Sequence, residues 1–430
     1  MISRFRAVYD EYPQQFWLLI GAAFINMVGN ALIFPFLALY ITDRFDVGMT
    51  RVGTIFAIFA VANLFGSTIG GALADRFGRK PIFLFALVTS ALGNLSLIIV
   101  PSFGYLYPIG FFLGIVGSMG DPPAQAMIAD MLPEEKRAEG FGVIRIVFNV
   151  AVMFGPVLGG LLAQRSYALL FIADTTTSLV TAVLLAIFLR ETRPEKTGEQ
   201  QQEETLAQSF RGYGIVLRDV VFMSFVMIGV LVQLVYIQMN TTLAVFLRDE
   251  HGILPQGFGL LIGMNAAMVV LMQFWITRRI RKGGYPPLLV MAAGTFLYAV
   301  GFGMFGFVSA TVLFVLAMVI ITIGEMFIAP VGQAMAANFA REDMRGRYMA
   351  VFSFGFAIAA GLGTLLAGLV IDNLNPNWLW HFALALGSVA ALGYVMLHRF
   401  AYKPDAEEDA ESAVEPDVAP AAASAETPAR

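Results

Sequence analysis

The sequence predicts an all-α membrane protein in which twelve transmembrane helices form two pseudo-symmetric six-helix bundles. Three observations support this prediction. The chain of 430 residues is 58% apolar and only 13% charged, whereas a soluble globular chain contains about 25% charged residues. It contains twelve apolar runs long enough to cross a bilayer, and its two halves share a repeated residue pattern.

The composition also excludes several classes of function. A soluble enzyme or nucleic-acid-binding domain of this length would need far more polar surface. The absence of Cys excludes disulfides and thiol catalysis. The three His, at positions 251, 381 and 398, are too far apart in the sequence to predict a metal site. We therefore expect no metal, no cofactor, no nucleic-acid partner and no enzymatic activity.

Each predicted helix is an apolar run of about 20 residues, the length that crosses a hydrocarbon core of about 30 Å. Gly, Pro or charged residues separate the runs. The first six helices are predicted at residues 15–41, 52–74, 81–100, 105–129, 141–164 and 168–189. The last six are predicted at residues 220–246, 257–277, 286–308, 310–336, 348–371 and 378–398.

One long polar connection divides these helices into two groups of six. Residues 191–218 are expected to form a cytoplasmic linker between an N-terminal bundle, residues 1–190, and a C-terminal bundle, residues 219–403. Residues 404–430 hold eight acids and one base. Such a segment cannot bury enough apolar surface to fold, so we expect a disordered acidic tail.

Lys and Arg are distributed unevenly among the connections. If both termini are cytoplasmic, 22 of the 27 bases lie on the cytoplasmic side and four on the outer side, while Arg145 lies within a span. Cytoplasmic loops are the ones enriched in Lys and Arg. The first span is too long for a cleaved signal peptide. We therefore expect a multi-pass protein of the cell (inner) membrane, in contact with bilayer lipid, with both termini in the cytoplasm.

An offset of 208 residues aligns the two halves of the chain. PPAQAMIAD (122–130) falls on PVGQAMAAN (330–338), and GPVLGG (155–160) falls on GTLLAG (363–368). Duplicated halves are common in secondary transporters, whose binding site lies between the halves near the middle of the membrane. Because one chain already contains both halves, a monomer suffices.

The connection after the second span reads GGALADRFGRKP. Its glycines permit a tight turn, an acid lies at a helix end, and three bases face the inner aqueous phase. Two interpretations remain open. Asp75 and Asp130 could hold Arg79 as a charge latch in one conformation, or the bases could serve only to set the topology. The predicted gating motif comprises Gly71, Asp75, Arg76, Gly78, Arg79, Lys80 and Asp130.

This connection resembles the inner-loop signature of the major facilitator superfamily, Gly-x-Leu-Ala-Asp-Arg-x-Gly-Arg-Lys, and the two-half layout of the whole chain is similar to that of the superfamily. The resemblance implies the major facilitator fold, with Asp75, Arg79 and Asp130 as gating residues. The second half retains only a degenerate version, TRRIRKGG (277–284), which has no acid at the matching position.

The GPVLGG segment of the fifth span supplies a second motif. Its glycines allow close helix packing, and its proline bends the helix. The segment resembles the antiporter motif of drug-exporting superfamily members. Such relatives commonly have an Arg in the fourth span where this chain has Gly110, and Arg145 is a candidate to replace it. The predicted antiporter motif comprises Gly155, Pro156, Gly159 and Gly160.

Four ionisable side chains lie inside the predicted spans: Asp121, Arg145, Asp174 and Glu325. Such residues are costly and mark functional sites by default. At 1.5 Å per residue, Asp121 lies about 13 Å and Glu325 about 20 Å from the inner edge, near the middle of the membrane. Arg145 is close enough in depth to reach Asp121, either as a coupling pair or as a static bridge. Glu325 lacks a basic partner at its depth, and desolvation favours the neutral form of such an acid.

We predict that Glu325 is the proton site, with Asp121 and Arg145 as a coupling pair. Neutral polar side chains are candidates for a central cavity, although interhelical hydrogen bonds explain single Asn or Gln residues equally well. Two of them, four residues apart, share one face of the first span. The candidates are Asn26, Asn30, Gln233, Tyr236, Gln238 and Asn240.

The function predicted from these observations is secondary active transport. The chain contains no G-x-x-x-x-G-K-[ST] loop for ATP, so we expect an ion gradient to supply the energy. We predict proton-coupled efflux of small amphipathic compounds or drugs by alternating access. Two alternatives remain open: an importer or facilitator of a small polar metabolite on the same fold, and a membrane sensor that transports nothing.

Overall fold

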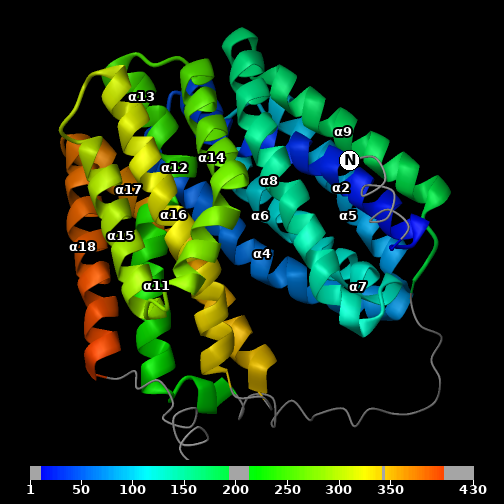
Figure 1. Cartoon of the computed structure of the whole chain (residues 1–430). Coiled ribbons are helices and arrows are strands. Elements are labelled where there is room, and N and C mark those ends of the chain that lie inside the picture. Colours follow the sequence, from blue (N-terminus) through cyan, green and yellow to red (C-terminus); the bar gives the residue numbers. More distant parts are fainter. Residues whose placement is uncertain (1–10, 193–212, 341–343, 401–430) are drawn as a thin grey trace, which may run out of the picture.

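The computed structural model describes residues 11–192, 213–340 and 344–400. Every regular element in this part of the chain is a helix, and twelve helical segments are long and apolar enough to cross a membrane. The predicted all-α class with twelve spans is therefore confirmed. The helices form two groups, with α2 to α9 on the right of Figure 1 and α11 to α18 on the left.

The first group contains the N-terminal six spans. In it α2 packs against α8 and α9, and α4 packs against α6. Its elements are α2 (Gln14–Ile33), η1 (Phe34–Phe36), α3 (Leu37–Phe45), α4 (Met49–Phe77), α5 (Arg79–Ser96), η2 (Leu97–Ile99), η3 (Phe103–Tyr105), α6 (Leu106–Met119), α7 (Asp121–Met131), α8 (Glu134–Arg165) and α9 (Ala168–Phe188).

The second group contains the remaining six spans. In it α15 packs against α16 and α18, and α11 packs against α17 and α18. Its elements are α11 (Val220–Tyr236), α12 (Gln238–Thr241), α13 (Leu243–His251), α14 (Pro255–Lys282), α15 (Pro287–Met304), α16 (Thr311–Phe339), α17 (Arg345–Asn373) and α18 (Asn377–Phe400).

Three of the spans predicted as continuous helices are broken. The first is interrupted by η1, which contains Pro35. The fourth breaks at Gly120, two residues before the first of two prolines that lack the N–H group a helix needs. The seventh breaks at Ile237 and again at Thr242. Discontinuous spans supply the binding sites of many transporters.

The predicted linker, residues 191–218, is partly helical. Residues 213–216 form a helical turn, and Val216 is fully buried in the apolar core. This part of the linker is therefore helical and packed against the protein, because it has an apolar side chain to bury. Residues 193–212 of the linker and the predicted tail, residues 404–430, lie outside the described residues.

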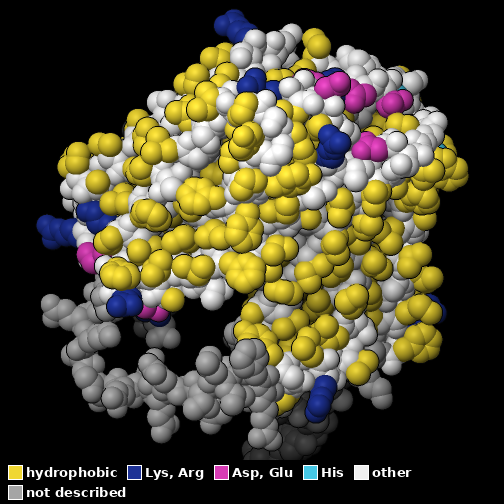
Figure 2. All heavy atoms as spheres, turned by 180° about the vertical axis from the view of Figure 1, so that it is seen from behind, with side chains coloured by type: hydrophobic (Ala, Val, Ile, Leu, Met, Phe, Trp, Pro, Cys, Tyr) yellow, Lys and Arg dark blue, Asp and Glu magenta, His cyan; other side chains and the backbone are white. Residues whose placement is uncertain are grey.

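The outer surface is predominantly apolar. Figure 2 shows hydrophobic side chains over most of the visible face, with charged side chains mainly near its margins. Large side chains are exposed here that a soluble protein would bury, for example Phe274 and Trp275, which are 67% and 68% exposed. A surface of this kind suits the hydrocarbon core of a bilayer.

The two groups meet mainly through two helix pairs, α4 with α17 and α8 with α14. Glycines make the close approach possible. A Cβ atom on Gly53 would lie 2.7 Å from the carbonyl oxygen of Thr364, and one on Gly160 would lie 2.7 Å from that of Pro255. These four residues lie toward the end of the molecule that contains residues 42–50, called here the 42–50 end. The opposite end, which contains the α4–α5 connection, is called the 77–80 end.

Candidate functional site

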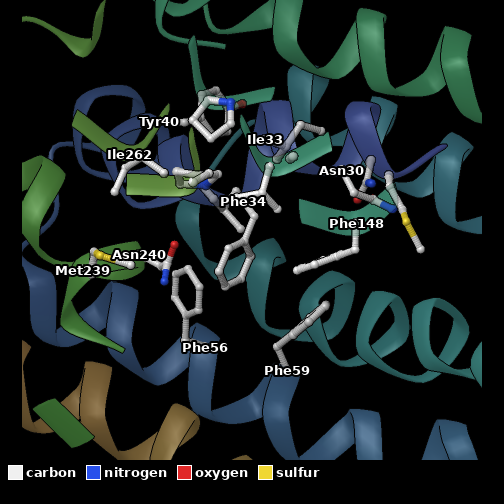
Figure 3. A pocket seen from close by; sticks show the side chains of 18 of the residues that line it. Asn30, Ile33, Phe34, Tyr40, Phe56, Phe59, Phe148, Met239, Asn240 and Ile262 are labelled. Atoms are coloured by element: carbon white, nitrogen blue, oxygen red, sulfur yellow. The ribbon is translucent and has the colours of Figure 1, made fainter. Parts of the chain in front are cut away.

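A cavity of about 620 Å³ lies between the two helix groups and is called here the central cavity. Its lining is mostly apolar and aromatic. Figure 3 shows the rings of Phe34, Phe56, Phe59 and Phe148 directed into it. An apolar cavity of this size with a few polar groups suits a small organic ligand.

Glu325 is the only carboxyl group among the described residues that line the central cavity. Helix α16 places it in the wall, where the hydroxyl of Tyr236 donates to Oε1 at 3.1 Å and the amide of Asn265 donates to Oε2 at 2.9 Å. No Lys, Arg or His forms an ion pair with it within the described part of the chain. The carboxyl group is therefore held by neutral donors from α11 and α14.

Further contacts orient these two donors. The ring of Tyr298 stacks on that of Tyr236, with centroids 5.6 Å apart and planes 14° from parallel. The Asn265 amide also donates to Thr322 Oγ1 at 2.9 Å, and that hydroxyl donates to the carbonyl of Met318. Neither Asn265 nor Tyr298 is among the residues predicted from the sequence. The signal for Asn265 was an amide in the middle of a mostly apolar span, which also contains Gln273.

Asp121 and Arg145 do not form the expected pair. Arg145 projects from α8 toward the second helix group, where its Nη1 donates to Gln333 Oε1 at 3.3 Å. Asp121 begins α7 and lies in a separate cavity bounded by α2, α4, α5, α6 and α9. The prediction of contact was wrong because depth along two helices does not specify the direction in which each side chain projects.

This separate cavity, called here the polar chamber, has a volume of about 640 Å³ and lies within the first helix group. Asn26 and Asn30 from α2 lie in its wall, and Ser178 Oγ donates to Asn26 Oδ1 at 2.9 Å. Asn30 and Asn94 line both the chamber and the central cavity. The two cavities are therefore neighbours that share part of their walls.

The other predicted cavity residues are divided between two environments. Tyr236 and Asn240 line the central cavity. Gln233 and Gln238 are not among its lining residues. The buried Gln238 instead donates from Nε2 to the carbonyl of Gly363 at 3.0 Å and accepts from Thr242 Oγ1 at 2.6 Å. The interpretation of Gln238 as a cavity residue was wrong, because its amide joins the broken seventh span to α17.

Comparison with known proteins decides the family. The Major Facilitator Superfamily profile matches residues 19–330 and 290–425. The chain belongs to the major facilitator superfamily. Its members are transporters and not enzymes.

The chain is 32% identical to the Na(+), Li(+), K(+)/H(+) antiporter of Planococcus maritimus, over 89% of this chain and 94% of that protein. It is 23% identical to the multidrug resistance protein MdtH of Salmonella paratyphi B, over 90% and 94% of the two chains.

Solved structures of superfamily transporters have the same fold. A POT family transporter in complex with 5-aminolevulinic acid superimposes with a TM-score of 0.75 at 16% identity, covering 90% of this chain and 96% of that one. The nucleoside transporter NupG gives a TM-score of 0.74 at 13% identity, covering 91% and 100%. The major facilitator fold expected from the sequence is thus confirmed.

The superfamily signature loop forms a compact ionic cluster at the 77–80 end. Arg79 forms an ion pair with Asp130 and donates to the carbonyl of Ala126 at 2.9 Å. Asp75 interacts with Arg79 electrostatically. Glu191, which the sequence analysis assigned only to the linker, accepts hydrogen bonds from the backbone N–H groups of Arg79 and Lys80 at 3.0 and 3.1 Å. It therefore satisfies free donors at the start of α5.

The remaining signature residues differ in their surroundings. Gly78 adopts a φ of +104°, a conformation that disfavours any side chain. Lys80 Nζ donates to the carbonyls of Ala186 and Leu189 at 2.8 and 2.6 Å. Arg76 lies over the ring of Phe77. A Cβ atom on Gly71 would meet only Pro122, at 3.7 Å.

The predicted antiporter motif lies where three helices meet. A Cβ atom on Gly155 or Gly159 would collide with Ala31 or Leu32 of α2, and one on Gly160 would collide with α14. Pro156 lies inside α8 and lines the central cavity. The motif therefore brings α8 close to both α2 and α14, and so connects the two helix groups.

Side-chain contacts close the 42–50 end between the two groups. Arg248 of the second group forms an ion pair with Asp43 of the first and donates to Thr42 Oγ1 at 3.2 Å. Tyr167 donates to Asp43 Oδ2 at 2.9 Å. Asp372 of α17 accepts from two backbone N–H groups at the start of α4, both at 2.8 Å. This cluster is not predicted from the sequence, because its members are far apart along the chain.

Electrostatics stabilise the protonated forms in this cluster. Burial, followed by the negative charge of Asp43, raises the pKa of Tyr167. Burial lowers the pKa of Arg248, but the carboxylates of Asp249 and Asp43 outweigh it, so the pKa of Arg248 is raised overall. Tyr167 and Arg248 therefore both remain donors to Asp43 over the ordinary pH range.

Proposed function

We propose that this superfamily member exports small amphipathic compounds in exchange for protons by alternating access between its two helix groups. The observation that supports this most directly is Glu325, a carboxyl group with neutral hydrogen-bond donors in the wall of an aromatic cavity between the groups. A cavity in this position can bind cargo and a proton close together.

Glu325 is the proposed proton site. The donors Tyr236 and Asn265 favour its ionised form, while the low-dielectric surroundings favour its neutral form. Opposing influences of this kind keep both protonation states accessible. Binding of an amphipathic compound beside Glu325 would change these surroundings, so cargo binding and proton release are coupled at one site.

The proposed transport cycle alternates closure between the two ends. With both termini in the cytoplasm, the 42–50 end faces outward, and the contacts of Arg248 and Asp372 close the central cavity to the outside in this state. Arg145 and Gln333 connect α8 and α16 toward the 77–80 end. We assign Arg145 a part in closing the inner side, together with the signature cluster of Asp75, Arg79 and Asp130.

The lining of the central cavity supports an amphipathic cargo. Phenylalanine rings and Met239 provide an adaptable apolar surface, while Asn30 and Asn240 offer hydrogen bonds to a polar group. The relative MdtH is named a multidrug resistance protein, which agrees with export of such compounds. A small polar metabolite would find few partners here.

Proteoliposomes containing a pH-sensitive dye test this function. Lipophilic cations and neutral drugs are added to wild type, to Glu325→Gln, and to Glu250→Gln as a control at an exposed acid of the 42–50 end. We expect cargo-triggered proton movement in wild type and in Glu250→Gln but not in Glu325→Gln. Cargo transport in all three without proton movement would support the importer or facilitator. Absence of transport in all three would support the sensor.

Exchange of monovalent cations for protons is a second candidate function. The relative from Planococcus maritimus, at 32% identity, is named a Na(+), Li(+), K(+)/H(+) antiporter, and the polar chamber provides a carboxylate apart from Glu325. Pulses of Na⁺, Li⁺ or K⁺ on the same liposomes distinguish the two candidates. Proton movement triggered by cations but by no organic compound would favour cation exchange.

A further inference from the structure

We propose that the polar chamber is a binding site for a monovalent cation such as Na⁺, Li⁺ or K⁺, with Asp121 as its charged ligand. This inference assigns a site to the second candidate function and rests on that function for the transport step. The binding site is separate from Glu325 and its donors, which all belong to the second helix group, whereas the chamber lies in the first.

The charge of the chamber matches a single positive ion. Asp121 is exposed to the chamber, and within the described residues its carboxylate has no ion pair and no hydrogen bond. No Lys, Arg or His is among the described lining residues. Divalent ions prefer several carboxylates, and the described residues contain no group of three acids, His or Cys that could hold a metal ion. One carboxylate among neutral groups therefore favours a monovalent cation.

The helix break beside Asp121 adds a backbone oxygen. Pro122 has no N–H group, so the carbonyl of Ser118, which lines the chamber, cannot form the usual α-helical bond to it. The Ser118 carbonyl receives a short-range bond from Gly120. Carbonyls released in this way at discontinuous spans coordinate cations in other transporters.

Side-chain oxygens lie at the same depth as the carboxylate. Asp121, Ser67 and Ser90 are each about ten residues, or roughly 15 Å, from the 77–80 end of their helices. Both serines line the chamber, and neither hydroxyl has a hydrogen bond within the described part of the chain. A carboxylate, two hydroxyls and a freed carbonyl are the oxygen ligands that hard cations prefer.

A second carboxylate lies behind the chamber wall. Asp174 is fully buried, and its Oδ2 accepts from Asn94 Nδ2 at 2.9 Å. This bond orients the Asn94 amide and leaves its carbonyl oxygen free of the bond to Asp174, so that this oxygen can coordinate a cation. The other oxygen of Asp174, Oδ1, has no hydrogen-bond partner in the described structure. In its ionised form, the Asp174 carboxyl group makes the chamber more favourable for a cation.

The shared wall explains how a cation could affect cargo. Phe59, Asn30 and Asn94 line both the chamber and the central cavity. A cation bound at Asp121 would attract the amide oxygens of this wall and so alter the surface that the central cavity presents to its ligand. The two cavities are therefore placed to exchange a cation against the proton of Glu325.

Direct binding tests the inference. Purified full-length protein is titrated with radioactive Na⁺ in a scintillation proximity assay, with Li⁺ and K⁺ as competitors. We expect saturable binding in wild type and in Asp46→Asn, a control at an exposed acid in the α3–α4 connection. Asp121→Asn should bind more than about tenfold more weakly. Equal binding by Asp121→Asn, or no saturable binding by wild type, would overturn the proposal.

Two further variants separate the possible failures. If Asp121→Asn does not fold, the double variant Ser67→Ala with Ser90→Ala retains the charge and should still weaken binding severalfold, and unchanged affinity would overturn the proposal. Glu325→Gln should retain the saturable Na⁺ binding that Asp121→Asn loses, while losing triggered proton movement. If wild type binds the cation but shows no proton movement, the proposed binding site is supported and the proposed antiport is rejected.

Discussion

At the scale of single residues, two acids within the spans, Glu325 and Asp121, differ in their partners. Glu325 accepts from a phenol and an amide, whereas Asp121 faces a chamber of hydroxyls and amides without forming a hydrogen bond within the described residues. The sequence predicted that both acids matter, because any carboxyl group in an apolar span is costly. It could not identify their partners, because Tyr236 and Asn265 lie 89 and 60 residues from Glu325.

Removing one donor to Glu325 should weaken proton release. Tyr236→Phe deletes the hydroxyl that donates to Oε1 but retains the ring that stacks on Tyr298. A hydrogen bond to a charged group contributes about 1.5 to 3 kcal/mol, so we expect cargo-triggered proton movement to slow by about tenfold or more. The liposome assay measures this rate.

Tyr298→Phe is the matched control for this change. Its hydroxyl forms no hydrogen bond to Glu325 in the described structure, so proton movement should stay within about twofold of wild type, since no contact of the ionised carboxylate is lost. Equal slowing in the two variants would show that the tyrosine pair acts through packing and not through the hydroxyl of Tyr236.

The bond from Tyr167 to Asp43 should be insensitive to mild alkali. The pKa of the Tyr167 hydroxyl is raised above the usual Tyr pKa of about 10. The stabilisation from its bond to Asp43 is therefore fully present below about pH 10, and it is lost only as the pH rises through the higher pKa of the folded protein. Tyr167→Phe should reduce the free energy of unfolding by about 1 kcal/mol, equally at about pH 7 and about pH 9. Thermal unfolding of both proteins at the two pH values measures the difference, and a difference that shrinks at the higher pH would contradict the shift.

At the scale of helices, the sequence predicted the location of every span but not the internal breaks. Apolar length alone identifies a crossing, and the predicted ends fall within a few residues of the observed ones. The breaks at Pro35 and Gly120 can be predicted locally, because a proline lies at the first and prolines follow the second. The seventh span breaks without proline, at Ile237, where the hydroxyl of Thr241 bonds to a backbone carbonyl.

Close packing of α8 on α14 should be sensitive to a single methyl group. In Gly160→Ala the new Cβ atom would lie 2.7 Å from the carbonyl oxygen of Pro255, so the helices must separate. Overpacking of this kind costs about 1 to 3 kcal/mol. We expect a lower midpoint of thermal unfolding for the purified protein.

Gly142→Ala is the control in the same helix. A Cβ atom there meets nothing within 4 Å, and replacing a helical Gly by Ala stabilises by about 0.5 to 1 kcal/mol. The two substitutions should therefore shift the unfolding midpoint in opposite directions. Shifts of the same sign and size would show that the contact with Pro255 does not limit the approach of the helices.

At the scale of the whole molecule, the contacts between the two groups are unequal at the two ends. The 42–50 end has an ion pair, hydrogen bonds and close glycine contacts, whereas toward the 77–80 end the described hydrogen bond between the groups is that of Arg145 with Gln333. Such an asymmetry is what one conformation of an alternating-access cycle requires.

Removing Arg248 should open the 42–50 end. The chain contains no Cys, so the substitution Phe34→Cys, at a residue that lines the central cavity, introduces a thiol that reports access without background. When Arg248→Ala is added to this variant, we expect a membrane-impermeant thiol reagent applied from the 42–50 side to react severalfold faster, because Asp43 loses its partner across the groups.

Arg51→Ala serves as the control for lost positive charge at the same end. Arg51 lies over the ring of Phe103 within the first group, so its removal from the Phe34→Cys variant should leave the reaction rate of the introduced thiol unchanged. If both substitutions accelerate the thiol reaction equally, the effect is one of general electrostatics, and Arg248 has no specific part in closing this end.

The sequence by itself determined the class of the protein, its twelve crossings and its family, because apolar length, a repeat and signature loops are properties of contiguous residues. Only the tertiary structure decided that Glu325 meets Tyr236 and Asn265, that Asp121 and Arg145 lie apart, and that Arg248 pairs with Asp43 across the two groups. These contacts join residues that are distant in the chain. Their formation depends on the direction in which each helix presents its side chains, and a hydrophobicity pattern common to all twelve spans does not specify that direction.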